Sequence, residues 1–222
     1  MPQPRQRARS DQDKEVRKTA LLTAARELAA EHGVREVTLT GVTSRVGLHP
    51  SALRRYFESR EELLLELAEQ GWADWRSRLL ADLAAFDGRR PSPVEVAEAV
   101  AGSLDALPLF CDLQTHVGLS LEGAVRLERA RQYKTAATTA YDAMTSALVE
   151  TGAGLDAEGA RTLLTAAMSC AAYLSQLSRP SPTLRQLYEE VPRWAHSALR
   201  FREQLTTLLR AVAVGVAKPP LT

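Results

Sequence analysis

Two adjacent arginines followed by a tyrosine are the residues of this sequence best suited to binding a charged polymer. Arg54, Arg55 and Tyr56 end a short segment that begins at His49 and contains Ser51. A guanidinium group can donate two hydrogen bonds to guanine O6 and N7, and Tyr and Ser hydroxyls suit phosphate oxygens. If one short helix presents these side chains together, the pattern predicts contacts with double-stranded DNA. The alternative is that the arginines only form a solvated helix face.

Two short helical patterns meet at Gly47, directly before these residues. Thr38 is placed to cap the first of them, which runs to about Val46. His49 is placed to cap the second, and Pro50 is its first residue, where the missing N–H group is tolerated. A pair of short helices joined by a tight turn is typical of a helix-turn-helix, which places its second helix in the major groove.

Longer helical patterns flank this pair on both sides. The preceding helix is expected over about residues 12–32, and Gly33 follows as its C-terminal stop. Ser59 is placed to cap the following helix, which is expected to run to about Phe86. The sequence therefore predicts a three-helix DNA-binding unit followed by a long helix that braces it.

Apolar and polar residues separate cleanly in the two short helices. The apolar residues that would close a small core are Leu39, Val42, Val46, Leu48, Leu53 and Phe57. The polar residues left outside are Thr40, Ser44, Arg45, His49, Ser51, Arg54, Arg55, Tyr56 and Arg60. Tyr56 and Phe57 could both be core residues, and we assign that role to Phe57 alone. The outer set is the candidate DNA-contacting surface.

The charge distribution agrees with a single DNA-contacting end. The 222-residue chain has a formal net charge of only +1. Residues 1–60 contain 12 Lys and Arg against 7 Asp and Glu, whereas the remaining residues contain 16 against 20. A basic head on a mildly acidic body suits a protein that touches phosphate at one end only. The arginines at positions 5, 7 and 9 could form a minor-groove arm or a disordered tail.

Several other classes of site have no signature in the sequence. Cys111 and Cys170 are the only cysteines, too few for a disulfide framework or a metal site, so we expect two buried thiols in a reducing compartment. No nucleophile elbow, phosphate loop or His-Glu metal motif occurs, so no catalytic residue, metal or cofactor is predicted. No secretory segment or apolar run of about 18 residues occurs, so we expect a soluble cytoplasmic protein with no membrane partner.

The remainder of the chain also has the helical period. Residues 87–93 form the clearest linker. The expected helices beyond it span residues 93–106, 108–120, 122–151, 156–178, 182–190 and 192–214. We therefore predict an all-α protein of about nine helices. Its expected parts are a disordered basic arm at residues 1–11, a helix-turn-helix domain at 12–58, a ligand-binding and dimerisation domain at 59–216 and a frayed tail at 217–222.

Two C-terminal helices carry apolar stripes that could pair two copies of the chain. The expected interface residues are Leu163, Ala167, Ala171, Leu174, Trp194, Ala198, Phe201, Leu205 and Leu209. Small residues among them permit close helix approach, and two helices from each copy would form a four-helix bundle. Twofold symmetry also suits a domain that covers one half-site. The alternative is that the stripes are core within one subunit.

The middle helices carry the candidate ligand pocket. Its expected lining is Trp72, Trp75, Cys111, His116, Tyr133, Ala137, Tyr141, Met144 and Tyr173. Apolar walls with a few polar tips suit a largely hydrophobic small molecule. For any single residue of the set, an ordinary core role is the alternative.

The segment around the turn resembles the N-terminal signature of the TetR/AcrR family of transcriptional regulators. Glu31-His32-Gly33 matches the end of the family's first helix. The later positions that match in type and spacing are Thr38, Val42, Gly47, Leu48, Leu53, Tyr56, Phe57 and Glu61-Glu62-Leu63. The match covers about residues 15–65, and many positions agree in one register.

The resemblance implies roles for individual residues. Tyr56 and Arg60 would contact phosphates, and Thr38 and Thr40 would approach the DNA backbone. The residues that would face the groove are His49, Pro50, Ser51, Arg54 and Arg55. Three residues depart from the family pattern, namely Gly41 inside a helix, Thr43 in place of a small Ala and Arg54 in place of Tyr. Base preference therefore does not transfer from relatives.

The sequence as a whole predicts a ligand-responsive DNA-binding regulator and not an enzyme. By the resemblance, it would be a repressor that binds a palindromic operator as a homodimer and is released by a small, largely apolar inducer. Its expected partners are double-stranded DNA, a second copy of the chain and an unidentified small molecule. The alternatives are a helical enzyme or small-molecule-binding protein that kept the fold without regulating DNA, and an activator or ligand-blind regulator.

Overall fold

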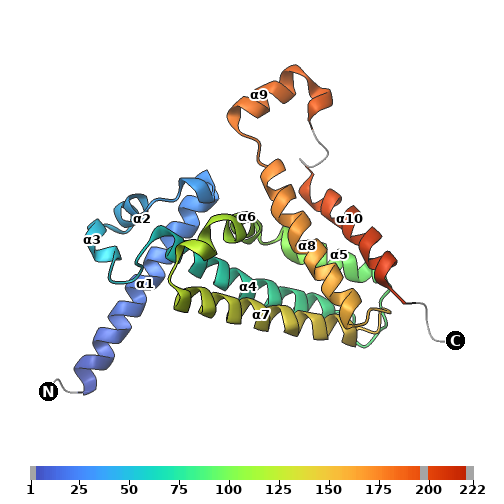
Figure 1. Cartoon of the computed structure of the whole chain (residues 1–222), viewed down its shortest axis with the longest axis horizontal. Helices are drawn as coiled ribbons and strands as arrows, with labels where there is room; N and C mark the ends of the chain where they lie inside the picture. Colours follow the sequence, from blue (N-terminus) through green and yellow to red (C-terminus); the bar gives the residue numbers. More distant parts are fainter. Residues whose placement is uncertain (1–3, 196–199, 219–222) are drawn as a thin grey trace.

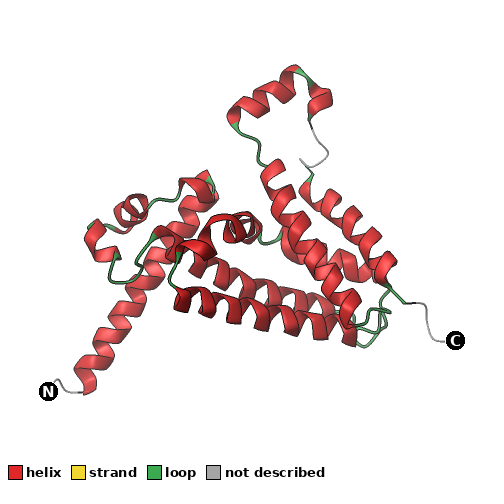
Figure 2. Cartoon of the chain, in the orientation of Figure 1, coloured by secondary structure: helices red, strands yellow, loops and turns green. Residues whose placement is uncertain are grey.

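The predicted all-α class is confirmed (Figure 2). The computed structural model describes residues 4–195 and 200–218, and it describes side chains for residues 12–49, 51–195 and 200–218. Every regular element in these ranges is a helix. The α-helices are α1 Pro4–His32, α2 Leu39–Val46, α3 Pro50–Leu53, α4 Arg60–Ala84, α5 Pro93–Asp105, α6 Pro108–His116, α7 Leu127–Glu150, α8 Ala157–Leu177, α9 Pro182–Glu190 and α10 Phe201–Val216. Single turns of 3-10 or π type are η1 Val34–Glu36, η2 Val117–Leu121, η3 Glu122–Ala124 and η4 Pro192–Trp194. No helix of the described residues is long and apolar enough to span a membrane.

Local capping sets the boundaries of the helix-turn-helix. Thr38 caps α2, and its side-chain oxygen accepts a hydrogen bond from the Gly41 N–H at 3.1 Å. Gly47 ends α2 in the left-handed region with φ of 70°, which glycine adopts without strain. His49 caps α3, accepting from the Ser51 N–H at 3.3 Å. The predicted caps of both short helices are therefore the observed ones.

The core of the N-terminal unit is small and continues into α4. In Figure 1, α1, α2 and α3 lie together at one end of the molecule. Its fully buried members from the predicted set are Val42, Leu53 and Phe57, while Leu39, Val46 and Leu48 are half-buried against the same core. Leu63 and Leu64 at the start of α4 are also fully buried in this continuous core. The long helix thus braces the unit, as expected for a core too small to stand alone.

The body consists of helices packed around α4. α7 lies alongside α4, and α8 and α10 pack with α5 on the other side of the body, whereas α9 stands away from the bundle (Figure 1). An aromatic cluster fills the centre, with the Trp72 ring centroid 5.5 Å from that of Trp75 and 5.4 Å from that of Phe110. The Trp75 indole N–H donates to Ser103 Oγ at 2.9 Å, so its polar group is satisfied in the core.

Several predicted boundaries differ from the observed ones. α1 begins at Pro4, so residues 4–11 continue the helix where a disordered arm was expected. A proline is tolerated in the first turn of a helix, and the Arg, Gln, Ala and Lys residues that follow favour helix. The last long helix begins at Phe201 and not near Pro192, because Pro192 starts only a single 3-10 turn and Arg200 has non-helical angles.

The middle of the chain also differs from the predicted pattern. One helix was expected over 122–151, but α7 begins only at Leu127. The π turn η2 and the 3-10 turn η3 fill the space between α6 and α7. Val125 has extended backbone angles, which ends the preceding turn and lets α7 start in a new direction.

The predicted dimer stripe is mostly core within one subunit, which corrects the assignment. The residues of this set that are buried inside the chain are Leu163, Ala167, Ala171, Leu174, Leu205 and Leu209. They are covered because α8 and α10 pack on each other and on α5. Phe201 is half-buried, Trp194 is exposed on η4, and Ala198 lies outside the described residues. Helical spacing identified a buried face but not what buries it.

Candidate nucleic-acid interface

The exposed face of α3 and the turn after it present a compact group of hydrogen-bonding side chains. His49, Ser51, Arg54 and Arg55 are all exposed. His49 Nδ1 lies 2.8 Å from Ser51 Oγ and also accepts the Ser51 N–H, so the first turn of α3 is held by its own cap. α3 is short: it ends at Leu53, Arg54 is its C-terminal cap, and isolated turns follow.

The two arginines have their guanidinium groups free. Within the part of the chain whose side chains are described, neither Arg54 nor Arg55 forms a salt bridge or a side-chain hydrogen bond. Tyr56 is half-buried and packs against the core, while Phe57 is fully buried, as predicted. Exposed donors without protein partners are what a surface that binds phosphates and base edges requires.

The N-terminus of α2 lies on the same unit and adds two hydroxyl groups. Thr38 and Thr40 are both exposed. At Gly41, one of the three departures from the family pattern, a Cβ would lie 3.1 Å from Thr38 Oγ1. The glycine therefore leaves room for the cap. Thr43 is fully buried, and its hydroxyl donates to the Leu39 and Thr40 carbonyls within the helix, where it is satisfied without an outside partner.

Two predicted DNA contacts, Arg45 and Arg60, are instead engaged by the protein. Arg45 Nη2 donates to both carboxylate oxygens of Glu31, at 2.9 and 3.0 Å, and so ties α2 to α1. Arg60 Nη2 donates to the Val34 carbonyl at 2.7 Å and to the Arg35 carbonyl at 3.1 Å. These contacts fix η1 against the start of α4. We therefore reassign both arginines to positioning the unit. Pro50 starts α3, and its side chain is outside the described set.

A buried carboxylate, which the sequence reasoning missed, connects this unit to the body. Asp112 on α6 is buried and accepts the Val34 N–H at 3.1 Å through Oδ2. Its Oδ1 accepts the Gln176 amide of α8 at 2.8 Å and lies 3.5 Å from His116 Nε2. Burial raises its pKa, but the adjacent His116 side chain and the hydrogen bonds from Gln176 and Val34 outweigh that effect and hold the pKa below its ordinary value.

One feature of the sequence points to this carboxylate. Asp112 lies between Cys111 and Leu113, which are both buried. A charged residue inside an apolar run is unusual and needs buried partners. The partner of Asp112 on the N-terminal unit is a backbone N–H of η1. A backbone donor cannot be predicted from a pattern of side chains. Asp112 thus joins η1, α6 and α8 through one group.

A second connection between the unit and the body is an exposed ion pair. Arg126, the cap of α7, lies 2.6 Å from a carboxylate oxygen of Glu58 and 3.3 Å from one of Glu62. Glu62 belongs to the first turn of α4. Because Arg126 and Glu58 are both exposed, their pair contributes about 0–1 kcal/mol, whereas the Glu62 side chain is only 12% exposed. Their consequence is positional: the start of α7 is held beside the junction of the recognition turn and α4.

Three of the predicted ligand residues do line one pocket. Trp72, Ala137 and Tyr141 border an open pocket of about 300 Å³ between α4, α7 and α8. The remaining lining residues are Lys134, Thr138, Thr165, Met168 and Ser169. The Tyr141 hydroxyl donates to the Arg161 carbonyl at 2.7 Å, which fixes its ring at the edge of the pocket. This is the volume of a small-molecule site, with a mixed apolar and hydroxyl lining.

The other predicted ligand residues do not line this pocket. Trp75 and Met144 are fully buried in the core. Cys111 is also buried, its thiol donating to the Leu104 carbonyl at 3.5 Å, and burial raises the pKa of this thiol to about 12. Tyr173 is exposed on the outer face of α8. Helical spacing placed these residues on the correct helices but could not distinguish core from pocket.

Two further residues of that set, His116 and Tyr133, belong to polar contacts inside the body. His116 stands beside Asp112, as described above. Tyr133 is buried, and its hydroxyl accepts the Trp72 indole N–H at 2.9 Å. Both residues therefore adjoin the region between α4, α6 and α7 and do not line the open pocket.

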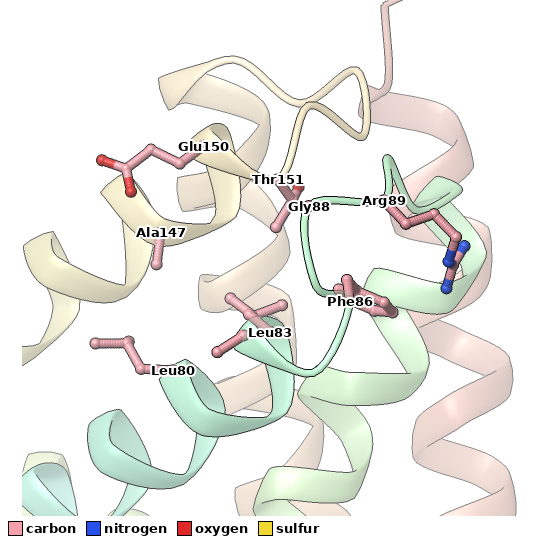
Figure 3. Close-up of a pocket in the computed structure, with 9 residues that line it drawn as sticks. Leu80, Leu83, Phe86, Gly88, Arg89, Ala147, Glu150 and Thr151 are labelled. Carbon is pink, nitrogen blue, oxygen red and sulfur yellow. The ribbon is translucent and has the colours of Figure 1, made fainter.

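A second pocket lies between the C-terminal ends of α4 and α7 (Figure 3). Its volume is about 410 Å³, and Leu80, Leu83 and Phe86 form much of its wall. Its charged residues are not turned inward: Glu150 points away from the apolar wall in Figure 3, and Arg89 pairs with Glu95 at 2.9 Å. None of the predicted ligand residues lines this second pocket.

Family models cover nearly all of this architecture. Residues 21–67 match the model described as bacterial regulatory proteins of the tetR family. Residues 69–220 match the model described as a tetracyclin repressor-like C-terminal domain. The N-terminal match contains α2, α3 and the capping residues described above. Members of this family are generally DNA-binding proteins without enzymatic activity. No curated protein sequence matches the chain.

Solved structures show the same fold at low sequence identity. The Thermus thermophilus FadR repressor in complex with lauroyl-CoA is 20% identical, with a TM-score of 0.54, covering 92% of this chain and 98% of that one. The multidrug binding protein EbrR with imidazole is 15% identical, with a TM-score of 0.60 and coverages of 93% and 97%. Bacillus subtilis FadR with stearoyl-CoA is 15% identical, with a TM-score of 0.53 and coverages of 87% and 98%. From its two family matches, the chain belongs to the TetR family of transcriptional regulators, as its resemblance to the family's N-terminal signature implied.

Proposed function

We propose that this regulator is a repressor that binds a palindromic operator as a homodimer, with α3 in the major groove. The observation that carries the proposal is the exposed set of hydrogen-bonding groups on α3 and the turn after it, in particular the unpaired Arg54 and Arg55. One unit of this size covers one half-site, so two copies related by a twofold axis would cover a palindrome. Thr38 and Thr40 would then approach the phosphates from α2, and Tyr56 from the turn.

The outer faces of α8 and α10 support a dimer that differs from the predicted one. Tyr173 on α8 is 65% exposed, and Val214 and Leu208 on α10 are 59% and 43% exposed. On α8 the exposed neighbours one and two turns before Tyr173 are small, namely Ser169 and Thr165. Both also line the 300 Å³ pocket, so a second subunit packed on this face would cover the opening of that pocket. Small residues allow close approach of a second helix pair, and large exposed apolar side chains gain by burial. We therefore assign the dimer contact to these outer faces.

The ligand would bind in the 300 Å³ pocket between α4, α7 and α8. Structural neighbours with the same fold are bound to lauroyl-CoA, stearoyl-CoA and imidazole, which supports a small-molecule ligand without identifying it. The Trp72 ring would give the pocket its apolar wall from α4. Because α4 begins beside the recognition turn, a ligand that moves α4 would change the separation of the two α3 helices.

Asp112 and Arg126 form two contacts through which a movement of the body would reach the DNA-binding unit. Asp112 connects α6 and α8 to η1, and Arg126 connects α7 to the first turn of α4. Both contacts join the body to the backbone segments on either side of α2 and α3. A ligand can shift the equilibrium only if it binds the non-DNA-binding arrangement more tightly. In this proposal the bound ligand favours a spacing that no longer fits the operator.

Fluorescence anisotropy with a labelled duplex from the DNA upstream of the gene tests the DNA-binding part. A dimer that neutralises six or more phosphates should lose roughly a thousandfold in affinity between about 50 and about 200 mM salt. Specific binding should also survive an excess of random-sequence duplex. Absent binding, or binding insensitive to salt, would contradict the proposal and favour a helical small-molecule-binding protein.

A further inference from the structure

Arg129 is a buried charged group with an incomplete set of partners. Only 7% of its side chain is exposed, and its Nη1 lies 2.7 Å from Glu69 Oε2 on α4. Its Nε and Nη2 atoms are buried and have no hydrogen-bond partner among the described residues. Buried guanidinium N–H groups without acceptors are strongly unfavourable, because their hydration is lost and not replaced. This edge of the guanidinium is therefore a donor surface that lacks its acceptor.

A second donor without a partner belongs to the same region. Arg129 and Tyr133 lie one turn apart on α7, facing Glu69 and Trp72, which lie about one turn apart on α4. Burial raises the pKa of Tyr133, and the adjacent Trp72 and Gln114 side chains oppose that rise, so Gln114 of α6 approaches the same hydroxyl. Gln114 Nε2 is itself buried without a hydrogen-bond partner among the described residues. Two helices, α6 and α7, thus carry unsatisfied donors on residues close to Tyr133.

We propose that Arg129 binds the oxyanion of the regulator's ligand, a carboxylate or phosphate group attached to an apolar body. This inference rests on the proposed ligand-responsive function and names the class of ligand. The Nε–Nη2 edge of a guanidinium presents two parallel N–H groups, whose geometry matches two oxygens of one carboxylate or phosphate. Gln114 would donate to the same group from α6.

The position of Trp72 connects this donor surface to the pocket. Its indole N–H donates to Tyr133 in the buried region, and its side chain also lines the 300 Å³ pocket with Ala137 and Met168. A ligand with an apolar body in the pocket and an acidic group beside Arg129 would therefore contact the Trp72 side chain from both regions. Lys134 at the pocket edge is exposed and paired with Glu122 at 2.8 Å, whereas Arg129 is buried and keeps two N–H groups without an acceptor, so Arg129 is the better placed cation for the ligand.

The acidic residues near Arg129 leave it able to bind an anionic ligand group. Glu69 occupies only Nη1 and is about one-third exposed, so its charge is partly screened by water. Glu122 is engaged by Lys134. The free guanidinium edge is more deeply buried than either carboxylate, and an anion placed there interacts with it at a lower effective dielectric.

Isothermal titration calorimetry of the whole chain with three ligands that share a twelve-carbon alkyl group tests the proposal. Dodecanoate and dodecyl phosphate carry the oxyanion, whereas dodecan-1-ol provides the same apolar body without it. We expect at least one oxyanion probe to bind the unaltered protein at least tenfold more tightly than dodecan-1-ol. In Arg129→Gln this preference should fall to within about twofold.

Arg131→Gln is the matched control, since Arg131 lies two positions along α7, is exposed and pairs with Glu128 at 3.2 Å. It should keep the full preference. If Arg129→Gln fails to fold, Arg129→Lys keeps the charge but not the planar fork, and should lose most of the preference. Equal binding of alcohol and oxyanion by the unaltered protein, or a preference that survives both Arg129 variants, would overturn the proposal. Because the assay contains no DNA, it remains decisive whether or not the chain binds an operator.

Discussion

Replacing Asp112 by Asn should weaken the connection between the DNA-binding unit and the body. Asn keeps one acceptor oxygen but turns the other into an NH₂ group. That group would then face either the Val34 N–H or the Gln176 amide, which now donate to Oδ2 and Oδ1 at 3.1 and 2.8 Å. A hydrogen bond to a charged acceptor contributes about 1.5–3 kcal/mol, and a buried donor left unpaired adds a penalty. We expect the free energy of unfolding to fall by about 3 kcal/mol at pH 7.

The pH dependence has a definite sign. The pKa of Asp112 is lowered in the folded chain, so its ionised form stabilises the fold at every pH above the unfolded value of about 3.9. That contribution is lost as the pH falls through the folded pKa. The uncharged amide of the Asp112→Asn variant resembles the protonated carboxyl group. The stability difference between the two proteins should therefore be full at pH 7 and shrink below about pH 4.

Two measurements on the same proteins check this prediction. Urea unfolding gives the free energies, and hydrogen exchange of the Val34 amide reports the individual bond, which should lose protection in Asp112→Asn. Asp105→Asn is the control, because Asp105 is exposed and pairs with Arg202 at 3.3 Å. It should change stability by less than about 0.5 kcal/mol. Unchanged stability together with unchanged Val34 exchange would refute the assigned role of Asp112.

Three further predictions concern the core and the scaffold. Arg60→Ala removes donors to the η1 carbonyls and should lower the free energy of unfolding by about 2 kcal/mol in urea titration; no loss would mean that Arg60 is free for phosphate. Gly71→Ala places a Cβ 2.4 Å from a ring carbon of Phe110 and should destabilise by about 1–3 kcal/mol, read as a lowered Tm; an unchanged Tm would contradict this packing. Burial raises the pKa of Cys111 to about 12, so at pH 8 its thiol should react with a thiol reagent only on unfolding. Cys111 should therefore react more slowly than the half-buried Cys170, and equal reaction rates would contradict the burial of Cys111.

Features governed by neighbouring residues were predictable from the sequence. Thr38, His49 and Ser59 cap their helices as expected, because a cap bonds to a backbone N–H only two or three residues away. Gly47 likewise ends α2 through its own backbone angles. The turn and the exposed arginine pair follow from this local chemistry, and with them the family assignment.

Features governed by distant partners were not predictable. Arg60 was predicted from the sequence to contact DNA, as Arg55 was, yet its partners are carbonyls of η1, more than twenty residues away. Leu205 and Leu163 follow helical spacing, which is the same whether a second subunit or α5 covers the stripe. Asp112 meets its partners only after three separate segments pack together. The spacing of apolar residues identifies which face of a helix is buried. Tertiary packing determines which element covers that face.

The central claim is that the exposed face of α3 and the turn after it read DNA. The affinity of the Arg54→Ala, Arg55→Ala double variant for the upstream duplex tests this claim most directly. A homodimer carries each substitution twice, so four lost contacts of about 1.5 kcal/mol each predict a loss of roughly ten-thousandfold in affinity. Tm should be unchanged, because neither side chain has a partner within the described protein. Arg78→Ala, an exposed arginine of α4 away from α3, should bind as the unaltered protein does. A double variant that binds the operator as tightly as the unaltered protein would contradict the account.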